Sequence, residues 1–182
     1  MGGIRRALDL QLLDILGEIE GRPFEGKAWR VVREGRSVID GSRGAGRWNP
    51  SHLSVLYTAK EADGAIAEIF FHLNRGQSIF PSRMRHVLYE LNIKTKNTLH
   101  LPDMKKLASL GVKEEHYQEL LYIRTQEIAE AADFLGFDGI IAPSARYQCD
   151  NLILFLDQFN VEDIEVISEK SIDWSVWRNP KK

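Results

Sequence analysis

One apolar segment with a carboxylate inside it limits most narrowly what this chain can fold into. Residues 61–74 carry apolar side chains at i, i+3 and i+4, a spacing that predicts a helix. Within its most apolar stretch, 64–71, the only charged residue is Glu68. At 100° per residue Glu68 points away from the stripe of Ile66 and Phe70, and its own side is also small or apolar (Gly64, Ala67, Phe71). We therefore expect a helix covered on both sides, with a carboxylate that needs a partner.

Strand patterns and helical patterns alternate along the rest of the chain. Strands are predicted at 29–32, 55–59, 86–93, 137–142, 152–156 and 161–167. Further helices are predicted at 4–19, 102–110 and 114–135. The sequence therefore predicts one α/β (α+β) domain with central β-sheets and flanking helices.

The 182 residues suit one domain with a full core. We expect an N-terminal amphipathic helix within 1–26, a main domain over 27–168 and a C-terminal tail over 169–182. Packing of the first helix on the domain is favoured over a partner-binding face. The tail carries Trp174 and Trp177, which suggest that it docks, although its end is expected to be partly disordered.

The composition bounds the function and the compartment. The formal net charge of -2 argues against a dedicated nucleic-acid binder. The single cysteine, Cys149, allows no disulfide within the chain and fits a reducing compartment. No apolar run approaches the roughly 20 residues of a membrane-spanning helix, and the N-terminus lacks the apolar core of a secretory signal. We expect a cytoplasmic protein without a membrane segment.

Four segments place polar groups where apolar neighbours are the default. They are Arg30 within a predicted strand, Arg47 to Asn49 in a glycine-rich loop, Glu68, and Ser144 to Arg146 after an apolar strand. Arginine pairs suit phosphate oxygens, aromatic rings stack on heteroaromatic rings, and a half-buried carboxylate suits a developing positive charge or a ribose hydroxyl. Together these groups indicate a pocket for a nucleotide or dinucleotide, with chemistry at a sugar carbon.

Each signal alone has an ordinary structural explanation. An arginine in a strand is more often a surface charge, Trp48 more often packs in a core, and Ser144 after a proline is most often a turn residue. No phosphate-binding glycine motif, nucleophile elbow or metal-ligand spacing occurs, so we expect no metal.

The motifs that carry these groups resemble the RES domain, the toxin half of bacterial RES–Xre toxin–antitoxin pairs. The matching pieces run from Trp29 to Leu156: WR at Arg30, GRWN (46–49), VLYTA (55–59), AIAE ending in Glu68, PSAR (143–146) and NLILF (151–155). One departure is Gly-Ala-Gly before Arg47 where Gly-Gly is typical. The resemblance implies an ADP-ribosyltransferase-like fold and cleavage of the nicotinamide–ribose bond of NAD⁺.

The resemblance also implies a role for each residue. Arg30, Glu68 and Ser144 are the implied catalytic residues. Arg30 and Arg47 would hold the pyrophosphate or ribose oxygens, Trp48 and Tyr57 the nicotinamide side, and Ser144 the nicotinamide ribose, with Arg146 also in the NAD⁺ site. Glu68 would stabilise an oxocarbenium-like transition state.

The acceptor stays open between water, phosphate and a protein side chain. Transferases that modify proteins often carry Glu or Gln two residues before the catalytic Glu, and this chain has Ile66 there. That favours NAD⁺ destruction and growth arrest over mono-ADP-ribosylation of a host protein. A nucleotide-binding module without catalysis is the non-enzyme alternative. The expected partner is an Xre-type antitoxin that blocks the site in a hetero-oligomeric complex, with DNA bound only through the antitoxin.

Overall fold

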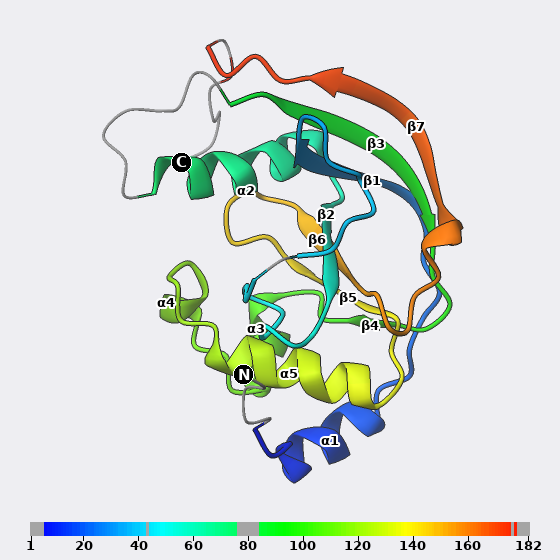
Figure 1. Ribbon diagram of the computed structural model, residues 1–182. Helices are drawn as coiled ribbons and strands as arrows, with labels where there is room; N and C mark the ends of the chain where they lie inside the picture. The colour runs from blue at the N-terminus through cyan, green and yellow to red at the C-terminus, as the bar shows by residue number, and fades with distance from the viewer. Residues whose placement is uncertain (1–5, 43, 76–83, 176, 178–182) are drawn as a thin grey trace.

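The computed structural model describes residues 6–42, 44–75, 84–175 and 177, and it contains one seven-stranded sheet with helices on its faces (Figure 1). The strand order is β4-β5-β6-β2-β1-β3-β7. The strands are β1 (Glu25–Arg33), β2 (Val55–Ala59), β3 (His86–Lys94), β4 (Thr98–His100), β5 (Gly139–Pro143), β6 (Asp150–Phe155) and β7 (Ile164–Ser171). The helices are α1 (Leu10–Gly17), α2 (Ala62–Asn74), α3 (Met104–Ser109), α4 (Glu114–Tyr117) and α5 (Ile123–Phe134), with a 3₁₀ turn at Val161–Asp163.

The sheet is nearly divided in two between its central strands. β1 pairs with β3 over its whole length, and β2 pairs with β6 over its whole length. Between β1 and β2, however, the only registered pair in the described residues joins Trp29 to Ala59. Beyond this pair the two strands separate, and β1, β3 and β7 curve along the right-hand side of Figure 1. The sequence predicted more than one sheet, whereas the structure has a single sheet with two halves.

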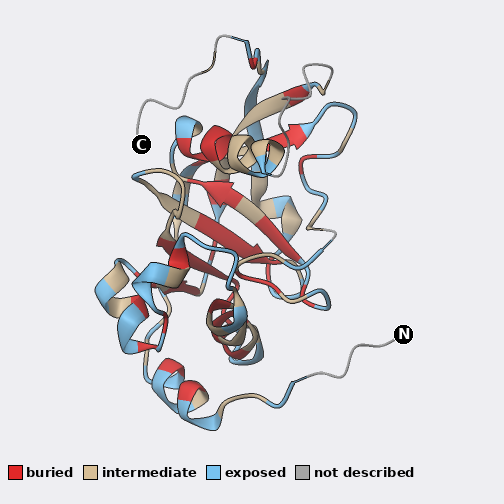
Figure 2. Ribbon diagram, turned by 90° about the vertical axis from the view of Figure 1, so that its left-hand side faces the viewer, coloured by how far each residue is buried: buried red, intermediate tan, exposed pale blue. Residues whose placement is uncertain are grey.

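Both faces of the half that contains β2, β5 and β6 are buried, as the red strands in Figure 2 show. Ile153 and Phe155 join the larger core with α1 and α5, whereas Leu152 and Leu154 join a second core on the other face. Burial on both faces explains why NLILF is a continuous apolar run and not an alternating one. A third core lies beneath α2 and includes Ile66 and Trp174.

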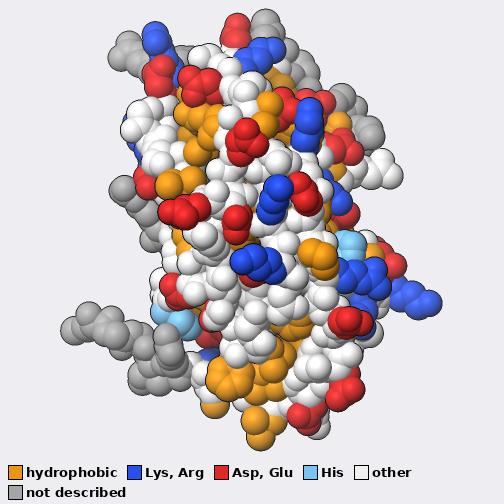
Figure 3. Space-filling model, turned by 90° about the vertical axis from the view of Figure 1, so that its right-hand side faces the viewer, with side chains coloured by type: hydrophobic (Ala, Val, Ile, Leu, Met, Phe, Trp, Pro, Cys, Tyr) orange, Lys and Arg blue, Asp and Glu red, His pale blue; other side chains and the backbone are white. Residues whose placement is uncertain are grey.

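The outer half of the sheet carries charged side chains of both signs, among exposed apolar ones. In Figure 3 acidic and basic groups alternate over the face on which β7 and β3 lie. Two ion pairs link neighbouring strands there, Lys27 to Glu90 at 2.5 Å and Lys94 to Glu25 at 2.9 Å. Charged side chains near an edge strand hinder its pairing with another chain.

The expected helix over 114–135 is wrong as one element. It divides into α4 and α5, and residues 118–122 are not helical. The carbonyl of Tyr117, which a continuous helix would use internally, instead accepts a hydrogen bond from the guanidinium of Arg47. Leu120 and Leu121, in the segment between α4 and α5, are 43% and 53% exposed.

Both ends of the chain add elements that pack on the domain. Helix α1 is shorter than the expected 4–19 because Asp9 accepts a hydrogen bond from the Leu12 amide and caps its start. Its Leu12 and Leu16 lie in the larger core, where α1 contacts α5. In the tail, the Trp174 indole donates to His86 Nδ1 at 3.2 Å, and 178–182 lies outside the described residues. The division at 26 and 168 stays a prediction.

Candidate active site

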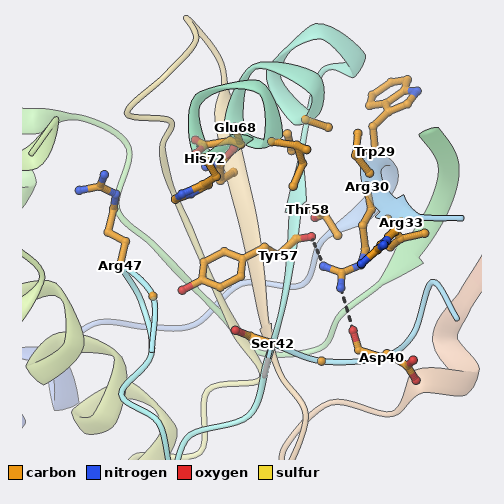
Figure 4. A pocket seen from close by; sticks show the side chains of 18 of the residues that line it. Trp29, Arg30, Arg33, Asp40, Ser42, Arg47, Tyr57, Thr58, Glu68 and His72 are labelled. Carbon is orange, nitrogen blue, oxygen red and sulfur yellow. Dashed lines mark hydrogen bonds between the residues drawn. The ribbon is translucent and has the colours of Figure 1, made fainter. Parts of the chain in front are cut away.

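A cavity of about 460 Å³ opens where β1 and β2 separate. Helix α2 forms one wall and the glycine-rich loop before β2 forms another. Five arginines border the cavity against two carboxylates, Asp40 and Glu68; the arginines are 30, 33, 36, 47 and 75. In Figure 4 Glu68 and His72 extend from α2 toward Tyr57, with Arg30 and Arg47 on opposite sides of the Tyr57 ring. This excess of positive charge favours an anionic ligand.

Glu68 is held through one of its two oxygens. Its Oε1 accepts hydrogen bonds from Ser144 Oγ at 2.7 Å and from Asn151 Nδ2 at 3.1 Å. No hydrogen bond among the described residues uses Oε2. Because Glu68 borders the cavity, the carboxylate has one fixed oxygen and one that is available to a ligand.

Ser144 lies behind Glu68 and does not border the cavity. Its Oγ accepts the backbone amides of Arg146 at 3.1 Å and Tyr147 at 3.2 Å, so its own hydrogen is directed at Glu68. In this arrangement Ser144 acts on the cavity through the Glu68 carboxylate, and its expected contact with a ribose stays a prediction.

Arg30 spans the opening between the two halves of the sheet. Its Nη1 donates to the carbonyl of Tyr57 at 2.8 Å, and its Nη2 donates to the carbonyl of Asp40 at 2.7 Å (Figure 4). Burial, together with the nearby Arg36, lowers the pKa of Arg30 to about 10, so it stays charged at neutral pH. The buried Nε has no hydrogen-bond partner among the described residues.

Arg47 is held between two aromatic rings on the opposite side of the cavity. Its guanidinium lies 4.8 Å from the centre of the Tyr117 ring and 4.9 Å from that of Tyr122. Its backbone carbonyl accepts from Thr125 of α5 at 2.5 Å, while the neighbouring carbonyl of Gly46 accepts from Gln126 at 2.9 Å. Helix α5 thereby fixes the loop that presents Arg47.

Tyr57 organises the glycine-rich loop through its hydroxyl. The hydroxyl accepts the Trp48 amide at 2.9 Å and donates to Asn49 Oδ1 at 2.7 Å. A Cβ at Gly46 would lie 2.7 Å from this hydroxyl, so only glycine lets the loop pass so close. Burial raises the pKa of Tyr57, which keeps the phenol protonated.

Of two further residues expected in the NAD⁺ site, Trp48 borders the cavity and Arg146 does not. Trp48 touches the cavity wall, but it is only 1% exposed and packs in the larger core, so its ring has no free face for stacking. Arg146 does not border the cavity: its guanidinium lies 3.4 Å from the centre of the Phe71 ring. Burial and the charge of Arg47 lower the pKa of Arg146.

Asn151 and His72 are among the cavity residues that the sequence analysis did not single out. Asn151 opens the NLILF run, and a polar residue at the start of a buried strand was the available signal. His72 lies one helical turn after Glu68, and that i+4 spacing could have placed it on the same face. Burial lowers the pKa of His72 despite the opposing charge of Glu68.

The described residues contain no group of three or more His, Cys, Asp or Glu side chains arranged to hold a metal ion. Within the same residues, no helix is long and apolar enough to cross a membrane.

The fold and the site define a mixed α/β domain with an arginine-lined cavity and a carboxylate held at its wall. The model of one family, the RES domain, matches residues 27–178. The chain therefore belongs to the RES domain family.

Among solved structures, the chain is similar to a chain in the crystal structure of the M. tuberculosis MbcT–MbcA toxin–antitoxin complex. The TM-score is 0.80 at 17% sequence identity, with 91% of this chain and 94% of that chain covered. At this identity the likeness establishes the fold alone. The comparison with curated proteins found no match.

Proposed function

We propose that this chain is the toxin of a toxin–antitoxin pair and that it destroys NAD⁺ by cleaving the nicotinamide–ribose bond. The observation that carries the proposal is Glu68, a carboxylate with one oxygen held by Ser144 and Asn151 and the other available at an arginine-lined cavity. Membership of the RES family and the likeness to a chain from a toxin–antitoxin complex support the biological role.

In the proposed reaction the bond between the ribose C1′ and the pyridinium nitrogen breaks, and nicotinamide leaves with the bonding electrons. The C1′ centre then carries positive charge, which Glu68 stabilises electrostatically. Arg30 and Arg47, on opposite sides of Tyr57, bind the pyrophosphate and neighbouring ribose oxygens, and Tyr57 lies on the nicotinamide side. Water or phosphate adds to C1′ and loses a proton to the solvent.

The nature of the acceptor divides the proposal into a glycohydrolase and a phosphorylase. In both, the product is ADP-ribose or its 1-phosphate, and depletion of NAD⁺ stops growth. Ile66 belongs to the core beneath α2, so the position two residues before Glu68 offers no side chain to activate a protein acceptor. This favours small acceptors over a protein side chain.

The proposed partner is an Xre-type antitoxin that covers the cavity in a hetero-oligomeric complex and mediates any contact with DNA. We place the reaction in the cytoplasm, where a free thiol such as Cys149 stays reduced and NAD⁺ is present.

The decisive experiment is nicotinamide release from NAD⁺ by the purified protein, with and without phosphate. We expect Glu68→Gln to fold normally and to lose about 10²–10³-fold in kcat, the usual effect of removing a preorganised electrostatic group. The matched control is Glu61→Gln, the same change at an exposed residue before α2 whose side chain makes no capping bond.

Equal turnover by Glu68→Gln and the unchanged protein would reject the central assignment. Phosphate dependence would identify a phosphorylase. If nicotinamide appears only with cell lysate, and label from NAD⁺ enters a protein, the activity is mono-ADP-ribosylation. A shift in Tm with NAD⁺ but no release under any condition would leave a nucleotide-binding module.

A further inference from the structure

Asn151 connects the sheet to Glu68. It is the second residue of β6, and its backbone pairs with Ala59 of β2 on one side and with Ala142 of β5 on the other. These small neighbours leave room for its side chain to reach α2, where Nδ2 donates to Glu68 Oε1 at 3.1 Å. Asn151 also borders the cavity.

The orientation of the Asn151 amide is dictated by its surroundings. The hydroxyl of Ser144 already accepts two backbone amides, so its single hydrogen goes to Glu68 Oε1. An ionised carboxylate oxygen only accepts, so the Asn151 atom that faces it must be the donor, Nδ2. The reversed amide would set two acceptors against each other.

This orientation leaves Asn151 Oδ1 without a partner. Oδ1 is buried and makes no hydrogen bond among the described residues. A buried acceptor without a donor lowers the stability of a fold, whereas an apolar side chain of the same size does not. Stability alone would therefore favour leucine at this position, between two largely apolar strands.

We propose that Asn151 is a positioning residue for Glu68, retained at a cost in stability. Together with Ser144 it holds Oε1 from two directions, and this fixes the carboxylate plane so that Oε2 is presented to the cavity. The inference rests on the proposed function. Glu68 must hold this orientation while positive charge develops on the ribose, so the orientation stabilises the transition state more than it stabilises bound NAD⁺.

The test is Asn151→Leu, which removes both the donor and the unpaired oxygen at nearly constant size. We expect kcat to fall about 10–100-fold, the usual effect of removing a hydrogen bond that orients a functional side chain. We expect KM to stay within about threefold of that of the unchanged protein. We expect Tm to stay the same or to rise. Asn92→Leu, on β3 and away from the cavity, is the matched control and should keep full activity.

Asn151→Asp separates shape from hydrogen bonding. It keeps the size of the side chain but sets a second carboxylate against Glu68, so kcat should fall at least as far as in the leucine variant.

The inference is overturned if Asn151→Leu keeps wild-type kcat, or if its Tm falls by several degrees along with its activity. Failure of the proposed function looks different, since the unchanged protein then releases no nicotinamide. In that case Tm still decides, because a less stable leucine variant would show that Asn151 serves the fold and not Glu68.

Discussion

The two arginines on opposite sides of the cavity are held by carbonyls and aromatic rings, and not by carboxylates. Arg30 donates to the carbonyls of Tyr57 and Asp40, and Arg47 to the carbonyl of Tyr117. Neither takes part in an ion pair among the described residues. Carbonyl partners fix the direction of a guanidinium without neutralising its charge, so both charges remain available to a pyrophosphate.

The Tyr57 hydroxyl is expected to contribute more to the free energy of unfolding than the hydroxyl of an ordinary tyrosine. Tyr57→Phe leaves the Trp48 amide and Asn49 Oδ1 without their shared partner. We expect the free energy of unfolding to fall by about 1–3 kcal/mol, measured by urea denaturation. NAD⁺ binding should weaken as well, because the loop that presents Arg47 loosens.

Tyr89→Phe on β3 is the control for this change. Its hydroxyl meets Glu169 on the outer half of the sheet and does not border the cavity. An equal loss of stability in both variants would contradict the special role of the Tyr57 hydroxyl.

The helices and strands that the sequence could predict are those with a clear local periodicity. Helix α2 and strand β2 lie where the pattern placed them, at Ala62–Asn74 and Val55–Ala59, because each is long or apolar enough to specify itself. Strand β4 was missed because it has three residues and depends on parallel pairing with β5. The break between α4 and α5 was missed because Arg47, 70 residues earlier in the chain, takes the carbonyl of Tyr117.

The same limit applies to the cavity. Arg30, Arg47, Tyr57 and Glu68 were expected in a pocket and all border it, since an unusual polar residue in an apolar context is visible locally. Whether Ser144 touches a ligand or another side chain depends on how α2 crosses the sheet, which no local pattern encodes. The presence of Asn151 at Glu68 depends on the same crossing.

That crossing depends on Gly64 in the first turns of α2. A Cβ there would lie 2.4 Å from Cys149 Sγ, closer than real contacts allow. We expect Gly64→Ala to destabilise the protein by about 1–3 kcal/mol through overpacking, although alanine is the better helix former by about 1 kcal/mol. Activity should fall with it as Glu68 moves off Ser144.

The double variant Gly64→Ala/Cys149→Ala tests this cause. Removing the sulfur should restore most of the lost stability, so the two changes should be clearly non-additive in thermal or urea unfolding. Simple additivity would show that Gly64 is needed for another reason. Burial raises the pKa of the Cys149 thiol to about 12, so at neutral pH this residue is a packing group and a poor nucleophile.

For the whole molecule, the near-division of the sheet is what creates the cavity. Two halves that paired fully along β1 and β2 would leave no opening there, but these strands pair only at Trp29 and Ala59 in the described residues. Arg30 follows Trp29 and reaches the β2 carbonyl of Tyr57, which lies two residues before Ala59. The Arg30 side chain thus makes part of the connection that backbone hydrogen bonds would make if β1 and β2 paired along their whole length.

Arg30→Ala is therefore expected to affect both the fold and the ligand. Loss of the two charged hydrogen bonds should lower the free energy of unfolding by roughly 2–4 kcal/mol, and loss of the charge should weaken NAD⁺ binding at least about tenfold. Urea denaturation and calorimetric titration would measure the two effects.

Arg33→Ala is the matched control, because it removes a cavity arginine from the same strand. The Arg33 side chain is exposed and makes no ion pair among the described residues, so its loss should weaken binding with little change in stability. If Arg30→Ala weakened binding yet left stability unchanged, the two halves of the sheet would be held together without it. If it lost stability yet bound NAD⁺ normally, Arg47 would be the arginine that contacts the pyrophosphate, and Arg30 would serve only to brace the opening.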